Sequence, residues 1–179
     1  MNTLRKASEL NAIVEIGVHH GKSFISMVNN LPRNSNCMAV AIDVFDMQEF
    51  NYDKSGNGSM EIFKSNMRRY TTHTTSFMNE HVSVFQADST QMTAADVFLL
   101  TKGRPVALFS VDGCHTSQCT LSDLELAFST LSPNGIIMID DYFNHNWPGV
   151  SYAVFTFLNK YEGQAFPIAT GQNKYYIVK

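Results

Sequence analysis

Short runs of apolar residues alternate with stretches in which apolar side chains recur every three or four positions. The apolar runs are four to six residues long, and most are too uniformly apolar for strands with one face in water. Such runs are typical of strands buried on both faces of a parallel sheet. They lie at Ala12–Ile16, Met38–Ile42, Val82–Phe85, Val106–Val111 and Ile136–Ile139.

The stretches between these runs have the spacing of amphipathic helices. The clearest is Ser117–Leu131, where Leu121, Leu124, Ala127, Phe128 and Leu131 form one apolar stripe. We expect further helices at Ser23–Asn30, Ser59–Tyr70, Ala94–Leu100 and Val150–Tyr161.

The alternation of strands and helices predicts the fold class. Parallel neighbours need crossover connections, which are nearly always right-handed, so helices cover both faces of the sheet. At the end of the chain, Ala165–Ala169 and Tyr175–Val178 flank a turn at Gly171-Gln172-Asn173, which indicates a hairpin. We therefore predict an α/β, Rossmann-like, doubly wound and mostly parallel seven-stranded sheet with a C-terminal antiparallel hairpin. Without an internal repeat or a linker, residues 1–179 form a single domain.

The composition of the chain argues against nucleic acid and membranes as binding partners. With 44% hydrophobic and 16% charged residues the chain can bury a core, and its net charge of -3 with scattered basic residues argues against nucleic acid. No apolar run is long enough for a bilayer, and the polar segment Met1–Leu10 does not resemble a signal peptide, so we expect a cytoplasmic protein without a membrane partner. The three cysteines lack CxxC spacing and predict neither a disulfide framework nor a zinc site.

A glycine-containing turn joins the first strand to the first helix. Gly17 and Gly21 flank its tightest part, where glycine permits positive φ and close approach of the main chain to a ligand. The following helix start, near Ser23, offers free N–H groups to a carboxylate. The segment is neither a GxGxxG dinucleotide fingerprint nor a P-loop, and an ordinary strand-to-helix turn would have the same glycines.

Acidic residues follow the other strands. Asp43 ends the second strand, where Rossmann-like folds bind the two ribose hydroxyls of an adenosine, although an acid there can also cap a turn. Asp88 and Ser89 follow the third strand, where Asp88 can equally be a helix cap.

Three carboxylates follow the fourth and fifth strands, which are neighbours in this topology. Asp112, Asp140 and Asp141 should therefore lie close together at the carboxyl edge of the sheet. Like charges in a dry cleft raise one another's pKa unless a cation or a proton neutralises them. Oxygen ligands suit Mg²⁺, Ca²⁺ or Mn²⁺ better than zinc, so we predict a hard divalent cation; the alternative is one capping and one solvated aspartate.

The order of these motifs resembles class I S-adenosylmethionine (SAM)-dependent methyltransferases. The glycine-containing turn matches the ExGxxxGxS form of their first motif. Three later segments resemble the macrocin-type O-methyltransferases and, in outline, catechol O-methyltransferase: the DGxH sequence from Asp112, the IDDY sequence ending at Tyr142, and Pro148-Gly149-Val150. The resemblance extends from Ala12 onward and includes Asn51–Asn66. It implies that SAM is bound by Glu15, Gly17, Val18, His19, Gly21, Ser23, Asp43, Asp88, Ser89 and Asp112.

The resemblance also implies a reaction. In both groups a cation on strand-end acids holds substrate hydroxyls beside the SAM methyl group, which assigns Asp112, Asp140 and Asp141 to Mg²⁺ or a similar ion. His115 takes the place of the catalytic base, because an imidazole accepts a hydroxyl proton at neutral pH; His145 is a weaker candidate. The expected function is O-methylation of a small hydroxyl compound, such as a sugar or glycosylated metabolite.

Two alternatives to an active O-methyltransferase stay open. One is a non-catalytic SAM-binding or structural subunit, suggested by the short length; the other is a nicotinamide-dependent reductase. Since roughly ten residues precede the first predicted strand, we expect internal loops or a second subunit to cover the substrate, which is compatible with a homodimer.

Overall fold

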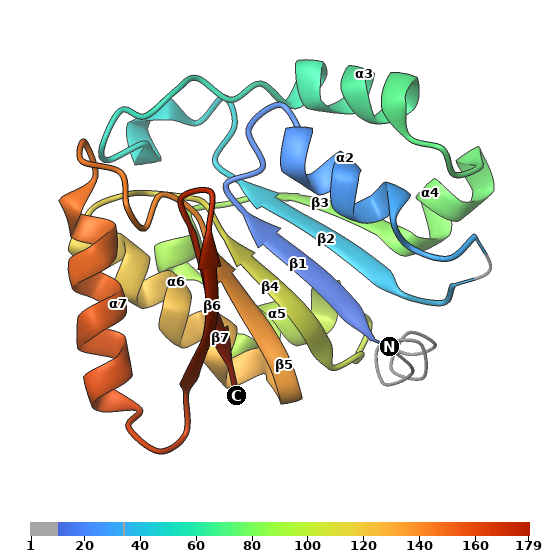
Figure 1. The fold of residues 1–179 in the computed structure, drawn as a ribbon. Coiled ribbons are helices and arrows are strands. Elements are labelled where there is room, and N and C mark those ends of the chain that lie inside the picture. Colours follow the sequence, from blue (N-terminus) through green and yellow to red (C-terminus); the bar gives the residue numbers. More distant parts are fainter. Residues whose placement is uncertain (1–10, 34) are drawn as a thin grey trace.

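The computed structural model describes residues 11–33 and 35–179, so the expectation for Met1–Leu10 lies outside the described residues. Its centre is one seven-stranded sheet in the order β3-β2-β1-β4-β5-β7-β6 (Figure 1). The strands are β1 (Ala12–Ile16), β2 (Met38–Asp43), β3 (Val82–Gln86), β4 (Val106–Val111), β5 (Leu131–Ile139), β6 (Phe166–Gly171) and β7 (Lys174–Val178).

The strand order confirms the predicted topology. The pairs β1–β2, β2–β3, β1–β4 and β4–β5 are parallel, whereas β7 is antiparallel to both β5 and β6. The chain runs outward from β1 to β3 and then returns to β4, so the order reverses between β1 and β4. In open α/β sheets this reversal leaves a crevice beyond the carboxyl ends of the strands, where ligands bind.

Helices cover both faces of the sheet, as a doubly wound fold requires. One face carries α2 (Lys22–Asn29), α3 (Met60–Tyr70) and α4 (Thr75–His81), and the other α5 (Ala94–Leu100), α6 (Ser117–Thr130) and α7 (Pro148–Lys160) (Figure 1). Two short 3₁₀ helices, η1 (Gln48–Phe50) and η2 (Ser89–Gln91), lie in connecting segments.

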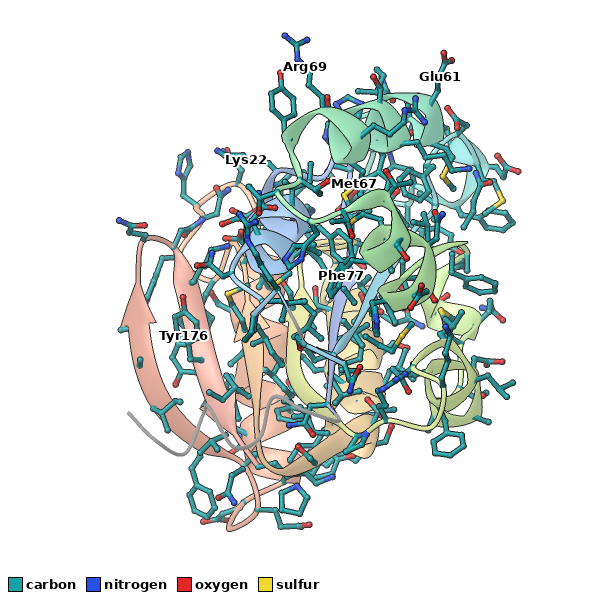
Figure 2. All side chains as sticks on the ribbon, turned by 90° about the vertical axis from the view of Figure 1, so that its right-hand side faces the viewer. Lys22, Glu61, Met67, Arg69, Phe77 and Tyr176 are labelled. Atoms are coloured by element: carbon teal, nitrogen blue, oxygen red, sulfur yellow. The ribbon has the colours of Figure 1, made fainter. Side chains whose placement is uncertain are left out.

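Each layer of helices has its own apolar core. Alternation along β1 sends Val14 into the core under α5, α6 and α7 and Ile13 into the core under α2, α3 and α4. Figure 2 shows Met67 and Phe77 on the side of α3 and α4 that faces the sheet, and Arg69 pointing into solvent. Strands β1 and β2 are buried on both faces, and their sequences are almost entirely apolar. At the edges of the sheet, β3 is partly exposed and β6 is exposed throughout, so the prediction of burial on both faces was wrong for β3.

Apart from the two 3₁₀ helices and shifts of one or two residues at the ends of elements, the structure differs from the sequence prediction at two places. Helix α4 was not predicted, because its seven residues follow a threonine-rich segment and are too few to show a clear period; its Phe77 ring packs between those of His73 and His81, at 4.1 and 4.8 Å. Strand β5 begins at Leu131 instead of Ile136. The turn residues after Leu131 predict a loop, but the pairing of Leu131 with Val106 starts the strand earlier, with a shift in register.

In the part of the chain that the structure describes, the helices are all too short or too polar to cross a membrane.

Candidate active site

The turn after β1 lies directly against the end of β4. Gly17 has φ +83°, and a Cβ atom there would come within 1.9 Å of the Asp112 carbonyl oxygen. Only glycine fits such a close approach of two main chains. The prediction that Gly17 needs positive φ is therefore confirmed, and the turn is held at the point where the strand order reverses.

Gly21 ends the same turn in a left-handed conformation, with φ +91°, immediately before α2. No side chain caps this helix, so its first N–H groups remain available to a ligand. A cavity of about 1080 Å³ lies in front of this helix start and is lined by Val18, His19 and Ser23. The arrangement is what a carboxylate-binding helix start requires.

Asp43 connects the glycine turn to the loop after β2. Its two carboxylate oxygens accept hydrogen bonds from the main-chain N–H groups of His19 (2.7 Å) and Phe45 (2.5 Å). The side chain nevertheless lines a second cavity, of about 440 Å³, and an ionised carboxylate can accept further hydrogen bonds from a ribose. Asp43 thus holds the turn together and also faces the space where a nucleoside would lie.

Asp88 has the capping role that the sequence analysis left open. Its Oδ1 accepts hydrogen bonds from the N–H and hydroxyl of Thr90, at 3.0 and 2.7 Å, which starts η2. Its Oδ2 accepts one from the Tyr52 hydroxyl, at 2.7 Å. Asp88 and Ser89 both line the 440 Å³ cavity, so capping does not remove them from the site.

The acidic group at the ends of β4 and β5 contains a lysine that the sequence analysis missed. Lys174, at the start of β7, forms an ion pair with Asp140. The Asp140 Oδ1 atom accepts a hydrogen bond from the N–H of Asp141, at 2.9 Å. The fold therefore supplies one internal cation to this group. No signal in the sequence could place Lys174 there, because its position depends on the register of the hairpin.

Two acids next to Lys174, the buried Glu15 and the half-buried Asp112, have raised pKa values. Burial, followed by the charges of Asp140 and Glu15, raises the pKa of Asp112 to about 8. Burial likewise raises the pKa of Glu15 to about 7, and its Oε1 accepts a hydrogen bond from the Ser110 hydroxyl at 3.2 Å. Carboxyls that hold a proton near neutral pH are frequent at functional sites, and a cation bound beside them would favour their ionised forms.

His115 lies between two carboxylates. Its Nδ1 is 2.7 Å from Asp53 Oδ2 and its Nε2 is 3.1 Å from Asp141 Oδ2. The Trp147 ring stacks on the imidazole at 4.5 Å with an interplanar angle of 18°. The two carboxylates and the Trp147 ring therefore hold the His115 imidazole in one orientation. His145, the weaker candidate for the base, is exposed.

Asp112, His115 and Asp141 can share a metal ion. One ligand atom from each lies within 4.8 Å of the others. The sequence analysis named Asp140 as the third ligand, but the structure directs that carboxylate to Lys174 and brings His115 into the group instead. Oxygen donors with one imidazole suit Mg²⁺ or Mn²⁺.

The two cavities meet at the glycine turn, because Gly17, His19 and Asp112 line both. The 440 Å³ cavity holds Asp43, Asp88 and His115, and the 1080 Å³ cavity holds Ser23 and Lys174. The predicted site residues thus line one region, except Glu15, which is completely buried, and Gly21; neither of these lines either cavity. The loop residues Tyr52 and Asp53 were missed, since an acid or an aromatic residue in a loop without periodicity gives no signal of its own.

A family model described as a methyltransferase domain matches residues 14–142, a range that begins in β1 and ends just after Asp141. The chain belongs to this methyltransferase family. The match includes the glycine turn and His115, and it favours methyl transfer over the alternative of a nicotinamide-dependent reductase. A search of curated protein sequences gave no significant match.

Solved structures show that this methyltransferase has the class I fold. The O-methyltransferase NovP superposes with a TM-score of 0.76 at 17% identity, over 99% of this chain and 74% of NovP. CalS11, a TDP-rhamnose 3'-O-methyltransferase of calicheamicin biosynthesis, gives 0.70 at 18% identity, over 99% and 76%. The N-methyltransferase NodS from Bradyrhizobium japonicum, solved with S-adenosylhomocysteine (SAH), gives 0.57 at 15%, over 99% and 82%. At these identities the likeness concerns the fold and leaves the acceptor atom open.

Proposed function

We propose that the protein transfers the methyl group of SAM to a hydroxyl of a small molecule. The observation that carries this proposal is the placement of His115, whose ring is fixed between Asp53 and Asp141 at the edge of the cavity that also contains Asp43 and Asp88. A fixed imidazole at this edge can take the proton of a hydroxyl, which has to leave when oxygen becomes an ether.

The cofactor sites follow from the two cavities. Asp43 would bind the ribose hydroxyls, Asp88 and Ser89 the adenine edge, and the start of α2 the methionine carboxylate. SAM supplies an electrophilic methyl group on a positively charged sulfur. Gly17 lies between the two halves, so the sulfur would lie near Asp112, which lines both cavities.

The chain's own residues then account for the proton. The acceptor hydroxyl lies against Nε2 of His115, which takes its proton while the oxygen bonds to the methyl carbon and the carbon–sulfur bond breaks. The products are a methyl ether, neutral SAH and a protonated imidazole. Asp141, 3.1 Å from Nε2, stabilises this positive charge.

We assign a divalent cation, when bound, to Asp112 and Asp141, because a base needs the free lone pair on Nε2. Such an ion would lower the pKa of the acceptor hydroxyl. The donor set fits Mg²⁺ or Mn²⁺. We also propose a sugar hydroxyl as one acceptor class, because CalS11 is a TDP-rhamnose 3'-O-methyltransferase.

Paired acceptors test this function directly. The protein is incubated with SAM and either catechol or o-phenylenediamine, which differ only in hydroxyl against amino groups, and with TDP-rhamnose; SAH and methylated product are measured by mass spectrometry. We expect methylation of a hydroxyl acceptor, suppression by EDTA, and recovery with Mg²⁺ or Mn²⁺. His115→Ala should lower kcat about 10²- to 10⁴-fold, and the matched variant His145→Ala should leave it unchanged.

Other outcomes contradict parts of the proposal. Methylation of the diamine alone would overturn the hydroxyl assignment. Tight binding of SAM without turnover on any hydroxyl compound would favour the non-catalytic SAM-binding subunit. An unchanged rate in EDTA would contradict the proposed divalent cation. Lys174 would then be the positive charge that neutralises the acidic group.

A further inference from the structure

The loop between β2 and α3 brings an acid to the proposed base from a distant part of the chain. In Figure 1 this loop passes over the carboxyl ends of the strands. Asp53 lies in it, 62 positions before His115, and its side chain is only 5% exposed. Its Oδ2 accepts hydrogen bonds from both the main-chain N–H (2.5 Å) and Nδ1 (2.7 Å) of His115. One carboxylate oxygen therefore fixes the backbone and the ring of the same residue.

The charge of Asp53 determines which ring nitrogen carries the proton. Both oxygens of this carboxyl accept main-chain hydrogen bonds, Oδ1 from the N–H of Ser55 at 2.9 Å and Oδ2 from the N–H of His115 at 2.5 Å, as an ionised carboxylate does. An ionised carboxylate only accepts hydrogen bonds, so Nδ1 must be the protonated nitrogen. In the neutral ring this leaves the lone pair on Nε2, the nitrogen that faces Asp141.

The second nitrogen lies where a proton is required. A neutral ring would direct its Nε2 lone pair at the Asp141 oxygen, 3.1 Å away, and two lone pairs at that separation repel. A proton that Nε2 takes from an acceptor hydroxyl makes the arrangement favourable. Trp147, stacked on the ring, prevents the imidazole from turning away.

We propose that Asp53 is the positioning residue of the base: it selects the Nδ1-protonated form of His115 and directs Nε2 toward the acceptor. The inference rests on the proposed function of His115. The hydroxyl of the neighbouring Tyr52 donates a hydrogen bond to Asp88, at 2.7 Å, so the same loop contacts the predicted adenine site and the base. Placement of this loop thus sets the orientation of the base.

The first test observes the ring without any turnover. Protein with ¹⁵N-labelled histidine is saturated with SAH, and the signals of His115 are assigned by their loss in His115→Ala. In the wild type we expect the proton on Nδ1. Asp53→Asn offers a neutral amide that can either accept from or donate to Nδ1, so the proton should shift toward Nε2. Asp46→Asn is the matched control and should leave the tautomer unchanged, because Asp46 is an exposed acid of the same loop that accepts a hydrogen bond from the Met60 N–H.

The second test separates positioning from stability. With the best hydroxyl acceptor of the catechol and TDP-rhamnose panel, Asp53→Asn should lower kcat about 10- to 100-fold with SAH affinity unchanged, and the variant should remain folded at the assay temperature. Asp53→Glu keeps the charge and should recover part of the rate. Asp46→Asn should behave as the wild type.

Other outcomes of the two tests would contradict either the positioning role of Asp53 or the proposed function of the site. Asp53→Asn with a wild-type kcat, or with a lowered kcat but an unchanged tautomer, would overturn the positioning role. If the wild type methylates no hydroxyl while the tautomer still depends on Asp53, the interaction between Asp53 and His115 stands and the proposed function of the site fails.

Discussion

At the scale of single residues, the site depends on how closely two strand ends approach each other. Gly17 is in contact with the main chain of Asp112, which places the glycine turn and the acidic group side by side. A side chain at position 17 would separate them, because the Asp112 carbonyl cannot move without breaking the pairing of β1 with β4. Local geometry at one glycine therefore holds the proposed cofactor half and the proposed catalytic half of the site together.

Gly17→Ala tests this contact. The added Cβ atom would lie 1.9 Å from the Asp112 oxygen at φ +83°, so we expect the free energy of unfolding to fall by more than about 2 kcal/mol and SAH binding to be lost. Urea unfolding and calorimetry measure both quantities. Gly171→Ala is the control, because a Cβ atom there has nothing within 4 Å. A Gly17→Ala variant that is stable and binds SAH with normal affinity would contradict the close approach.

At the scale of elements, the sequence predicted the layers better than the site. Apolar runs revealed the strands, and strand ends revealed Asp43 and Asp112, because burial on both faces and position after a strand are properties of short segments. The ion pair of Lys174 with Asp140 could not be predicted, since it depends on hairpin register. Asp53 could not be predicted either, since the path of a loop over the sheet is set by tertiary packing.

Helix α6 shows the same limit within one element. Its apolar stripe was predicted, and Leu124, Ala127 and Phe128 are buried as expected. The helix also buries Asp123 completely, close to Gly113, where a Cβ atom would lie 3.2 Å from Asp123 Oδ2. A periodic pattern assigns an acid to the solvent side, so this buried carboxyl was missed.

Asp123 should make stability depend on pH. Burial raises its pKa from 3.8 to about 7, so between these values the folded protein holds a proton that the unfolded chain has lost. The free energy of unfolding therefore falls as pH rises from about 4 to about 7, by roughly 2–3 kcal/mol from this group between pH 5 and pH 8. Urea unfolding at pH 5 and pH 8 should show a smaller fall in the free energy of unfolding for Asp123→Asn than for the wild type. The fall that remains in this variant comes from Glu15 and Asp112. Glu125→Gln, on the same helix but accessible to solvent, should retain the wild-type fall, and an equal fall in Asp123→Asn would refute the assignment.

At the scale of the whole molecule, the reversal of strand order creates one site from two cavities. They lie on either side of Gly17 and share His19 and Asp112. A ligand long enough to reach both cavities makes contacts in each of them, but it loses translational and rotational entropy only once. This geometry suits a nucleoside joined to an amino acid better than either part alone.

Fragments of the cofactor test whether the cavities act as one site. SAH at 100 times its Kd should raise the free energy of unfolding by about 2.7 kcal/mol, whereas adenosine and methionine should each bind at least about 100-fold more weakly than SAH. Asp43→Asn should weaken the binding of adenosine and SAH more than the binding of methionine, because Asp43 lines only the 440 Å³ cavity. Thermal unfolding and calorimetry provide the comparison, with Asp46→Asn as the control. Adenosine binding as tightly as SAH would mean that the 1080 Å³ cavity contributes nothing to the cofactor, and the methionine end would have to lie elsewhere.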